Sequence, residues 1–443
     1  MNRTQGFSRR RFLAASAGAL AAGSGRGQDG DGAAPPDARL AVHGGPKAVP
    51  GPPPRLVRWG QPERERLTAM IGQDSLFYWK GPQTAALTER FRRVCPLTHV
   101  MPCSSGTAAV HIATAAAGIG PGDEVITSPI TDIGTVIGAL YQQAVPVFAD
   151  LGPSTYNLDP AAVERRITPK TRAIIAVHLA GNPCDLDALR ALADKHGLVL
   201  IEDCAQAWGA RYRGKPIGTV GHIACFSLQN AKQITCGDGG VVASGDPRIG
   251  PLLQRFGDKG FDRVDKSGLF AAFATNYRMS EPQAAVAAAQ LDRLEGIAAT
   301  RARLGGLLGD AIAGAPGVEP HLVRPDDRCT YWFYMLRVRP GALRCDRAAF
   351  VKALTAEGVP AAAGYIPVPL YGNPVFQKHG FFAGRWPVKE FGLTAMDYTT
   401  VSCPEAETIL KAGVRVTVHE GMTDAYVRSL AVAVQKVARH YAA

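Results

Sequence analysis

Short apolar runs alternate with amphipathic segments between about residues 55 and 294 of the chain. The runs are rich in β-branched residues and bounded by polar or glycine-containing turns, which is typical of buried strands. The strands predicted in this way are 124–127, 145–150, 173–178 and 198–201. Leucine and alanine recur at helical spacing from residue 186, and Gly197 ends that helix. This alternation predicts an α/β domain with a mostly parallel sheet.

The pattern changes after about residue 283. A long helical stretch runs through Leu291 and Leu294 towards Leu308. Beyond it, apolar runs at 334–338 and 414–418 mix with helical segments. We therefore predict a large α/β domain over 55–295 and a smaller α+β domain over 296–443.

The first 54 residues do not follow either pattern. Basic residues precede an apolar run from Phe12 to Ala22, which is too short for a spanning helix of about 20 residues and is typical of a signal peptide. The sequence Ser8-Arg9-Arg10-Arg11-Phe12-Leu13 also fits the twin-arginine export pattern. We predict a twin-arginine signal over 1–23 and export to the periplasm or another extracytoplasmic space; without a working signal the protein would stay cytoplasmic. Residues 24–54 are rich in Gly, Pro and Ala, which predicts a flexible linker or arm.

The positive net charge is the unusual feature of the composition. The 443 residues carry a net charge of +11, with 49 basic and 38 acidic side chains. Cleavage after residue 22 would remove four arginines and leave 45 basic residues against 38 acidic ones, a net charge of +7. Interleaved basic and aromatic residues, which would favour nucleic acid, are absent from the sequence. No later segment is apolar enough for a membrane anchor, so we expect neither partner.

Nine cysteines are scattered along the chain without a Cys-x-x-Cys pair. This spacing excludes a dense disulfide framework and the common structural zinc patterns, and we expect neither a metal nor an essential disulfide. Cys204 and Cys236 flank the candidate chemistry and are expected to be small buried residues.

Two segments place polar groups where a parallel sheet binds ligands. Cys103-Ser104-Ser105-Gly106-Thr107 leads into an apolar helix, whose N-terminus offers N–H groups to an anion, although a simple helix cap has the same pattern. Asp203 follows the buried strand that ends in Glu202. A buried carboxylate needs a cationic partner, which is either a protonated ring nitrogen or a structural salt bridge.

Two further segments extend the pattern. Lys232 follows Phe226-Ser227-Leu228 and precedes a glycine-rich turn, so a partly buried amine there would act as a nucleophile towards an aldehyde. A lone lysine is more often a solvated surface group. The segment Asn276-Tyr277-Arg278 precedes a long Ala/Leu helix and could equally be a helix cap.

Together, in this order and spacing, the four segments resemble the sugar aminotransferases of the DegT/DnrJ/StrS family. The resemblance extends from about Leu40 to Ala443 and includes Cys403-Pro404-Glu405 and His419-Glu420-Gly421 near the C-terminus. It implies the aspartate-aminotransferase-like (type I) fold, with a large mixed-sheet domain and a smaller α+β C-terminal domain. It also implies pyridoxal 5′-phosphate (PLP) as cofactor and a homodimer with shared active sites.

The resemblance assigns a role to each matching residue. Lys232 would form the Schiff base with PLP, Asp203 would pair with the pyridine nitrogen, and Gln206 would contact the ring or its hydroxyl. The residues that would hold the phosphate are Gly106, Thr107 and Ser227, with Asn276 reaching the cofactor of the neighbouring subunit. His178 would lie on the substrate or ring side, or else be a buried, hydrogen-bonded histidine.

One position departs from the family pattern. Where members commonly carry an aromatic residue stacked on the cofactor ring, this chain has Asp132. An acid cannot stack, so Asp132 would contact an amine or hydroxyl of the substrate or turn aside. Lys80 and Lys259 would meet an anionic substrate or lie solvated on the surface.

The resemblance implies transfer of an amino group from glutamate or glutamine to a keto group of a sugar or cyclitol. An alternative is PLP-dependent sugar dehydration or epimerisation on the same fold. Family dehydratases replace the Schiff-base lysine with histidine, so Lys232 argues against dehydration. A non-catalytic binding protein that uses the basic charge is the third hypothesis.

Overall fold

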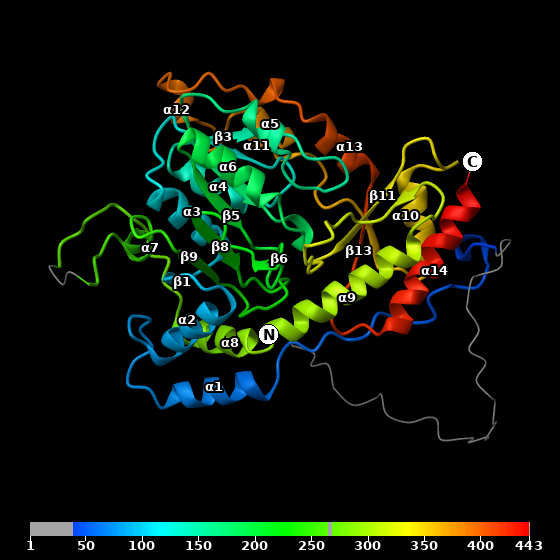
Figure 1. Ribbon diagram of the computed structural model, residues 1–443, viewed down its shortest axis with the longest axis horizontal. Helices are drawn as coiled ribbons and strands as arrows, with labels where there is room; N and C mark the ends of the chain where they lie inside the picture. The colour runs from blue at the N-terminus through cyan, green and yellow to red at the C-terminus, as the bar shows by residue number, and fades with distance from the viewer. Residues whose placement is uncertain (1–38, 265–267, 443) are drawn as a thin grey trace, which may run out of the picture. The chain divides into compact units, whose positions relative to one another are not determined.

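The computed structural model describes residues 39–264 and 268–442 of the chain (Figure 1). The predicted signal peptide and the first part of the predicted linker lie outside the described residues. None of the described helices is both long enough and apolar enough to cross a bilayer.

A seven-stranded mixed sheet organises the first half of the chain. Its strand order is β1-β9-β8-β5-β4-β2-β3, and β9 runs antiparallel to both of its neighbours. The strands are β1 (His99–Cys103), β2 (Glu124–Thr127), β3 (Val145–Phe148), β4 (Thr171–Val177), β5 (Val199–Asp203), β8 (Ile223–Ser227) and β9 (Gly240–Ser244). The predicted strands are confirmed with small shifts at their ends, and the predicted mixed sheet is the one observed.

Alternate residues of the strands enter two different cores. On β4, Ile174 and Ala176 pack with α6 (Leu186–His196), whereas Ile175 packs with α3 (Gly106–Ala116) on the opposite face. Because a strand side chain changes face at every residue, a strand with helices on both faces must be apolar throughout. The other helices around this sheet are α1 (Gln61–Ile71), α2 (Pro82–Val94), α4 (Gly134–Tyr141), α5 (Pro160–Glu164), α7 (Gly250–Gly257) and α8 (Glu281–Leu291).

Local signals set several helix ends. Gly197 adopts φ 63° beyond α6, a left-handed conformation that suits glycine and closes the helix. The stretch predicted as one long helix is divided into α8 and α9 (Leu294–Ile312). The division keeps Leu291 and Leu294 buried in the same core.

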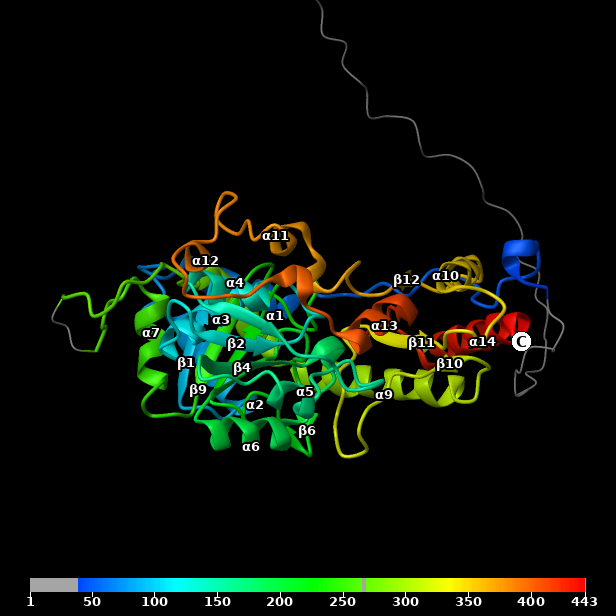
Figure 2. The same cartoon turned by 90° about the horizontal axis from the view of Figure 1, so that it is seen from above.

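A second sheet of four antiparallel strands lies in the C-terminal part. Its order is β10-β11-β13-β12, and α9 and α14 run side by side next to it (Figure 1). The elements are β10 (Val318–Glu319), β11 (Tyr334–Val338), β12 (Ala361–Ala363), β13 (Gly413–Val416), α10 (Arg347–Ala356), α13 (Pro404–Ala412) and α14 (Asp424–Tyr441). In Figure 2 these elements lie in a separate layer group from the strands of the seven-stranded sheet.

Part of the C-terminal region packs against the large sheet instead. Between β12 and α13, the segment 370–403 contains α11 (Pro374–Gln377) and α12 (Pro387–Glu390), and its aromatic residues share a core with Phe148 of β3. Tyr398 donates a hydrogen bond to the Pro146 carbonyl at 2.9 Å, and the Leu370 N–H donates to the Pro129 carbonyl at 2.9 Å. The range 296–443 therefore includes a segment that belongs, by its packing, with the large sheet.

The end of the predicted linker is also packed. Leu40 and Val49 are buried in the core of the small sheet. The N–H groups of Ala41 and Ala48 donate to the two oxygens of Glu357 at 2.8 and 2.9 Å. Lys436, 2.9 Å from Glu357, completes a buried ion pair, so residues 40–49 form part of the folded body rather than a free arm.

Candidate active site

The carboxyl ends of the parallel strands surround a cavity of about 490 Å³. In open α/β sheets ligands bind at this edge. The cavity brings together seven of the residues predicted from the sequence: Gly106, Thr107, Asp132, Asp203, Gln206, Ser227 and Lys232. They lie at or after the ends of four different strands, so the fold places side by side groups that lie far apart in the chain.

Asp203 ends β5 and is buried at the base of the cavity. Thr135 donates to its Oδ2 at 2.8 Å, and the Ala205 N–H donates to its Oδ1 at 3.1 Å. Burial raises the pKa of Asp203 above its ordinary value, although these hydrogen bonds and the charge of Lys232 oppose that shift. A protonated nitrogen beside Asp203 would stabilise the carboxylate.

Lys232 reaches the cavity from the loop after β8 and is only 8% exposed. Arg58 donates to the Lys232 carbonyl at 2.7 Å and fixes the backbone there. The Nζ atom lies 3.8 Å from the centre of the Trp332 ring. Burial lowers the pKa of Lys232 to about 8, against the opposing charges of Asp203 and Asp132. Near neutral pH a usable fraction of this amine is therefore unprotonated and nucleophilic.

The N-terminus of α3 forms an anion cradle beside the lysine. Ser105 caps the helix by accepting the Ala108 N–H at 3.0 Å. A Cβ added to Gly106 would lie 2.6 Å from the Cβ of Ser227, so only glycine allows the two loops to approach this closely. Backbone N–H groups, the Thr107 and Ser227 hydroxyls and the helix dipole all favour a phosphate here.

Gln206 joins the base of the cavity to the small sheet. Its Oε1 accepts the Ala180 N–H at 2.9 Å, and its Nε2 donates to the Tyr365 hydroxyl at 3.3 Å. Tyr365 and Trp332 line the cavity from the C-terminal part of the chain. The sequence argument missed both, as well as Thr135, since nothing local marks which distant residues will face the lysine.

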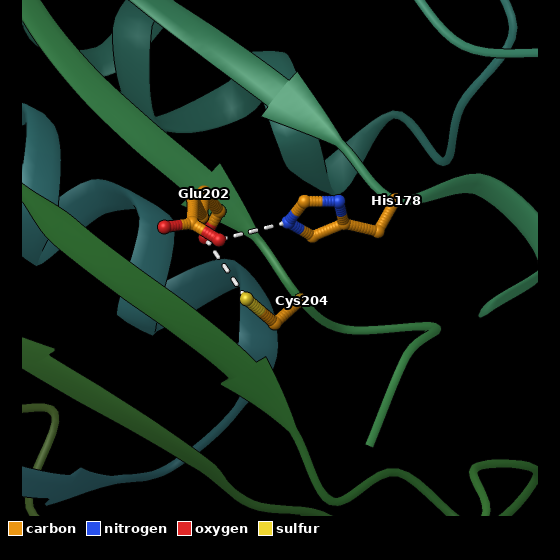
Figure 3. A group of neighbouring side chains, drawn as sticks. All are labelled: His178, Glu202 and Cys204. Carbon is orange, nitrogen blue, oxygen red and sulfur yellow. Dashed lines mark hydrogen bonds and ion pairs between the residues drawn. The ribbon is translucent and has the colours of Figure 1, made fainter. Parts of the chain in front are cut away.

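His178 is not among the residues that line the cavity. Its ring points towards Glu202 (Figure 3). The Cys184 N–H donates to its Nδ1 at 3.0 Å, so its Nε2 carries the proton donated to Glu202 at 3.1 Å. His178 is therefore neutral and matches the buried, hydrogen-bonded alternative rather than a substrate contact.

Glu202 carries the charge of this buried pair. Its oxygens also accept N–H groups from Gly218, Val220 and Gly221. Burial opposes ionisation, but the hydrogen bonds from His178 and the backbone outweigh it and lower the pKa of Glu202. Cys204 brings its sulfur close to both groups. Because both carboxylate oxygens and both ring nitrogens are already hydrogen-bonded, the cluster is a structural network in the described protein.

Three predicted residues lie away from this cavity. Asn276 is exposed, and its Oδ1 accepts a hydrogen bond from Arg278 at 2.7 Å. Lys80 and Lys259 are also exposed, and Lys259 lies 5.1 Å from the ring centre of Phe261. The nine cysteines are all among the described residues and are free thiols; Cys204 is buried and Cys236 partly exposed.

Residues 60–435 match the model of the DegT/DnrJ/EryC1/StrS aminotransferase family. This chain belongs to that family. The aminotransferase is 38% identical over 280 residues to GDP-perosamine synthase of Caulobacter vibrioides, covering 63% of this chain and 75% of the relative. It is 34% identical to the L-glutamine:2-deoxy-scyllo-inosose aminotransferase of Streptomyces paromomycinus, over 90% of this chain and 98% of that one.

A solved structure of similar fold is 3-amino-5-hydroxybenzoic acid synthase. It superposes with a TM-score of 0.76 at 29% identity, covering 87% of this aminotransferase and 99% of the neighbour. The fold prediction is confirmed by this likeness. Family membership favours an enzyme over a non-catalytic binding protein.

Proposed function

We propose that this aminotransferase uses PLP to move an amino group from glutamine or glutamate to a keto group of a sugar or cyclitol. The observation that carries the proposal is Lys232, a buried amine with a lowered pKa that shares one cavity with the buried carboxylate of Asp203. Relatives named for sugar and cyclitol substrates support the acceptor class.

The residues present fit PLP. The close approach of Gly106 to Ser227 leaves an anion cradle for the phosphate at the start of α3. Asp203 would face the ring nitrogen, and Lys232 would bind the aldehyde carbon. Bound PLP supplies an electron sink for the carbanion that forms when the donor loses its α-proton.

The protein residues have separate tasks in this reaction. With PLP bound, the Nζ atom of Lys232 would accept the α-proton of the donor and later return a proton to the product amine side of the reaction. Asp203 keeps the ring nitrogen protonated through its charge. Trp332 and Tyr365 cover the cavity from the C-terminal part and reduce the access of water to Lys232.

Replacement of the lysine tests the proposal. Lys232→Ala should abolish the visible absorption of lysine-linked cofactor and reduce turnover by about 10³-fold. Borohydride reduction of the unaltered protein followed by peptide mass mapping should place the cofactor on Lys232. Lys195→Ala, which removes an exposed lysine paired with Glu164, is the matched control and should behave like the unaltered protein. Cofactor found on another lysine would contradict the assignment.

The reaction type has its own readout. Mixing the cofactor-loaded protein with L-glutamine should convert the visible spectrum to that of the pyridoxamine form in a single turnover. An unchanged spectrum with both glutamine and glutamate would favour the dehydratase or epimerase alternative.

We also propose a homodimer in which Asn276 reaches the cofactor phosphate of the other subunit. Its exposure, together with that of Phe273 and Phe270 in the same loop region, supports such a contact. Mixing Lys232→Ala and Asn276→Ala subunits should restore activity, because one site of each mixed dimer has neither change. Failure to recover activity in verified mixed dimers would contradict shared sites.

Export of the folded, cofactor-loaded protein is the third proposal, supported by the paired Arg9 and Arg10 and the apolar run that follows them. Replacement of both arginines by lysine should retain the protein in the cytosol. Unprocessed, full-length native protein found only in the cytosol would contradict it.

A further inference from the structure

The entrance of the cavity carries an acid, Asp132, at the position where the family pattern has an aromatic residue. Asp132 lines the same cavity as Lys232, and its side chain is exposed. Its negative charge opposes the lowering of the pKa of Lys232 by burial and adds to the raised pKa of Tyr365, so Asp132 lies within electrostatic reach of both.

The backbone holds this carboxylate in one orientation. Oδ1 of Asp132 accepts the N–H of Gly134 at 2.8 Å. A Cβ at Gly134 would lie 2.7 Å from Oγ1 of Thr107 and 2.9 Å from Oδ1 of Asp132, so a larger residue there would displace these two side chains. Oδ2 has no hydrogen-bond or ion-pair partner within residues 39–264 and 268–442. The second oxygen is therefore available to a ligand.

The charges in the cavity are unbalanced in favour of acids. Among the described residues that line it, the ionised groups are Asp132, Asp203 and Asp238 against the single cation Lys232, with no arginine. In the proposed function, Asp203 is matched by the ring nitrogen and Lys232 is linked to the cofactor. Asp132 and Asp238 then remain as acids without a cation among the residues that line the cavity. Of these two, Asp132 is the one whose charge acts on Lys232.

Two aromatic rings line the same cavity as Asp132. Trp332 and Tyr365 pack edge to face with their ring centres 5.7 Å apart, and Trp332 already presents its face to a cation, Lys232. A free carboxylate oxygen in a cavity that also carries aromatic rings is a combination that recognises ammonium groups, because hydrogen bonding and cation–π attraction act together.

The amino donor cannot be the source of that ammonium group. The donor amine must lose its charge before it attacks the cofactor, and the donor carries carboxylates that Asp132 would repel. An amine elsewhere on the acceptor keeps its charge throughout the reaction. It can therefore remain hydrogen-bonded to Oδ2 while the keto carbon lies near the cofactor.

We propose that Asp132 is a specificity-determining residue that binds an ammonium group on the acceptor, so that the preferred acceptor is a keto sugar or cyclitol already carrying an amine. This inference rests on the proposed function and names its substrate class. The class of reaction that must supply this acceptor is one that has already introduced an amine and then oxidised another hydroxyl to a ketone.

Three polyols of the same length test the charge preference on the cofactor-loaded protein. N-methyl-D-glucamine is cationic, D-sorbitol is neutral and D-gluconate is anionic. Their inhibition of the half-reaction with L-glutamine gives three inhibition constants. We expect the cation to bind about ten-fold more tightly than the neutral polyol, the effect of one hydrogen bond between charged groups, and the anion to bind most weakly.

Asp132→Asn keeps an oxygen for the Gly134 N–H and removes only the charge. It should bring the cationic and neutral inhibition constants within two-fold of each other, whereas Asp132→Glu should retain part of the preference. Asp194→Asn, on the exposed face of α6 next to Arg190, is the control and should leave the ratio unchanged.

The outcomes separate this inference from the proposed function. A protein that binds PLP and reacts with L-glutamine but shows no preference for the cation, or keeps the preference in Asp132→Asn, overturns the role of Asp132 alone. A protein that never acquires lysine-linked cofactor overturns the proposed function itself.

Discussion

The floor of the cavity, formed by Asp203, Lys232, Gly106 and Ser227, differs in kind from its mouth, formed by Asp132, Trp332 and Tyr365. Asp203 and Lys232 are buried and held by hydrogen bonds from the surrounding loops. Asp132 is exposed and has one oxygen without a partner among the described residues. The floor is therefore suited to hold one cofactor tightly, whereas the mouth has a free polar atom that can bind a substrate and release it.

Burial explains why the same charge acts differently in the two regions. Desolvation shifts the pKa values of Asp203 and Lys232 because the charged forms lose their hydration in the floor. In the mouth, water screens a charge until a substrate displaces it. Substitutions in the floor should therefore reduce the reaction rate or cofactor binding. Substitutions in the mouth should instead reduce the discrimination between substrates.

After replacement of Lys232 itself, Asp203→Asn should give the largest effect on catalysis. Without the carboxylate the ring nitrogen loses its proton, and the single-turnover rate with L-glutamine should fall by about 10²-fold or more. Stopped-flow absorbance measures this rate. Thr135→Val, which removes one hydrogen bond to Asp203, should give a smaller decrease in the same measurement. A rate within ten-fold of the unaltered protein would assign the electronic role to another group.

Gly106→Ala should weaken cofactor binding by about ten-fold, because the added Cβ forces apart the two loops that meet at Ser227. Equilibrium dialysis of the cofactor-free protein against PLP measures the dissociation constant. Gly306→Ala is the matched control, since a Cβ there meets nothing within 4 Å in α9. Equal affinity in both variants would place the phosphate elsewhere.

The rate of cofactor capture should depend on pH through Lys232 in the floor, and Asp132 in the mouth should shift that dependence by a smaller amount. In cofactor-free protein only the unprotonated Lys232 amine reacts, so the capture rate should rise with pH through about 8, the pKa that burial sets. The charge of Asp132 raises that pKa, so Asp132→Asn should move the midpoint to lower pH. A midpoint unchanged by this substitution would mean that solvent screens Asp132 from Lys232.

His178→Gln should have the smallest effect on turnover, because the residue is not among those that line the cavity. We expect kcat within about three-fold of the unaltered protein, but a loss of about 1–3 kcal/mol in the free energy of unfolding, from the disturbed hydrogen bonds around buried Glu202. Chemical denaturation measures the second quantity. A large fall in kcat with unchanged stability would instead indicate that His178 contacts the substrate or the cofactor ring.

The floor could be predicted from the sequence because Asp203 and Ser227 end strands, Gly106 begins a helix, and Lys232 lies in the loop that follows one of these strands. Asp203 follows an apolar run and Gly106 starts a helix, and strands of a parallel sheet meet at one edge. The mouth could not be predicted in the same way. Trp332 and Tyr365 lie in the C-terminal part, and no periodic pattern relates them to Lys232.

The sequence pattern also could not predict which core the C-terminal part would pack against. The segment 370–403 was predicted within the small domain but packs on the large sheet. There the Leu370 N–H donates a hydrogen bond to the carbonyl of Pro129, three residues before Asp132. Local hydrophobicity shows that Phe376 or Tyr398 is buried, but not which of two cores receives it.

The sequence by itself determined the alternation of strands and helices, the residues at the strand ends and, through the family resemblance, the lysine that would carry the chemistry. These follow from short-range periodicity and from motifs whose parts are adjacent in the chain. The packed structure was needed to see that His178 supports Glu202 and that Asp132, Trp332 and Tyr365 line one cavity. Such contacts depend on how two sheets and a returning segment pack, which is a balance of burial summed over the whole protein and is not encoded at any single position.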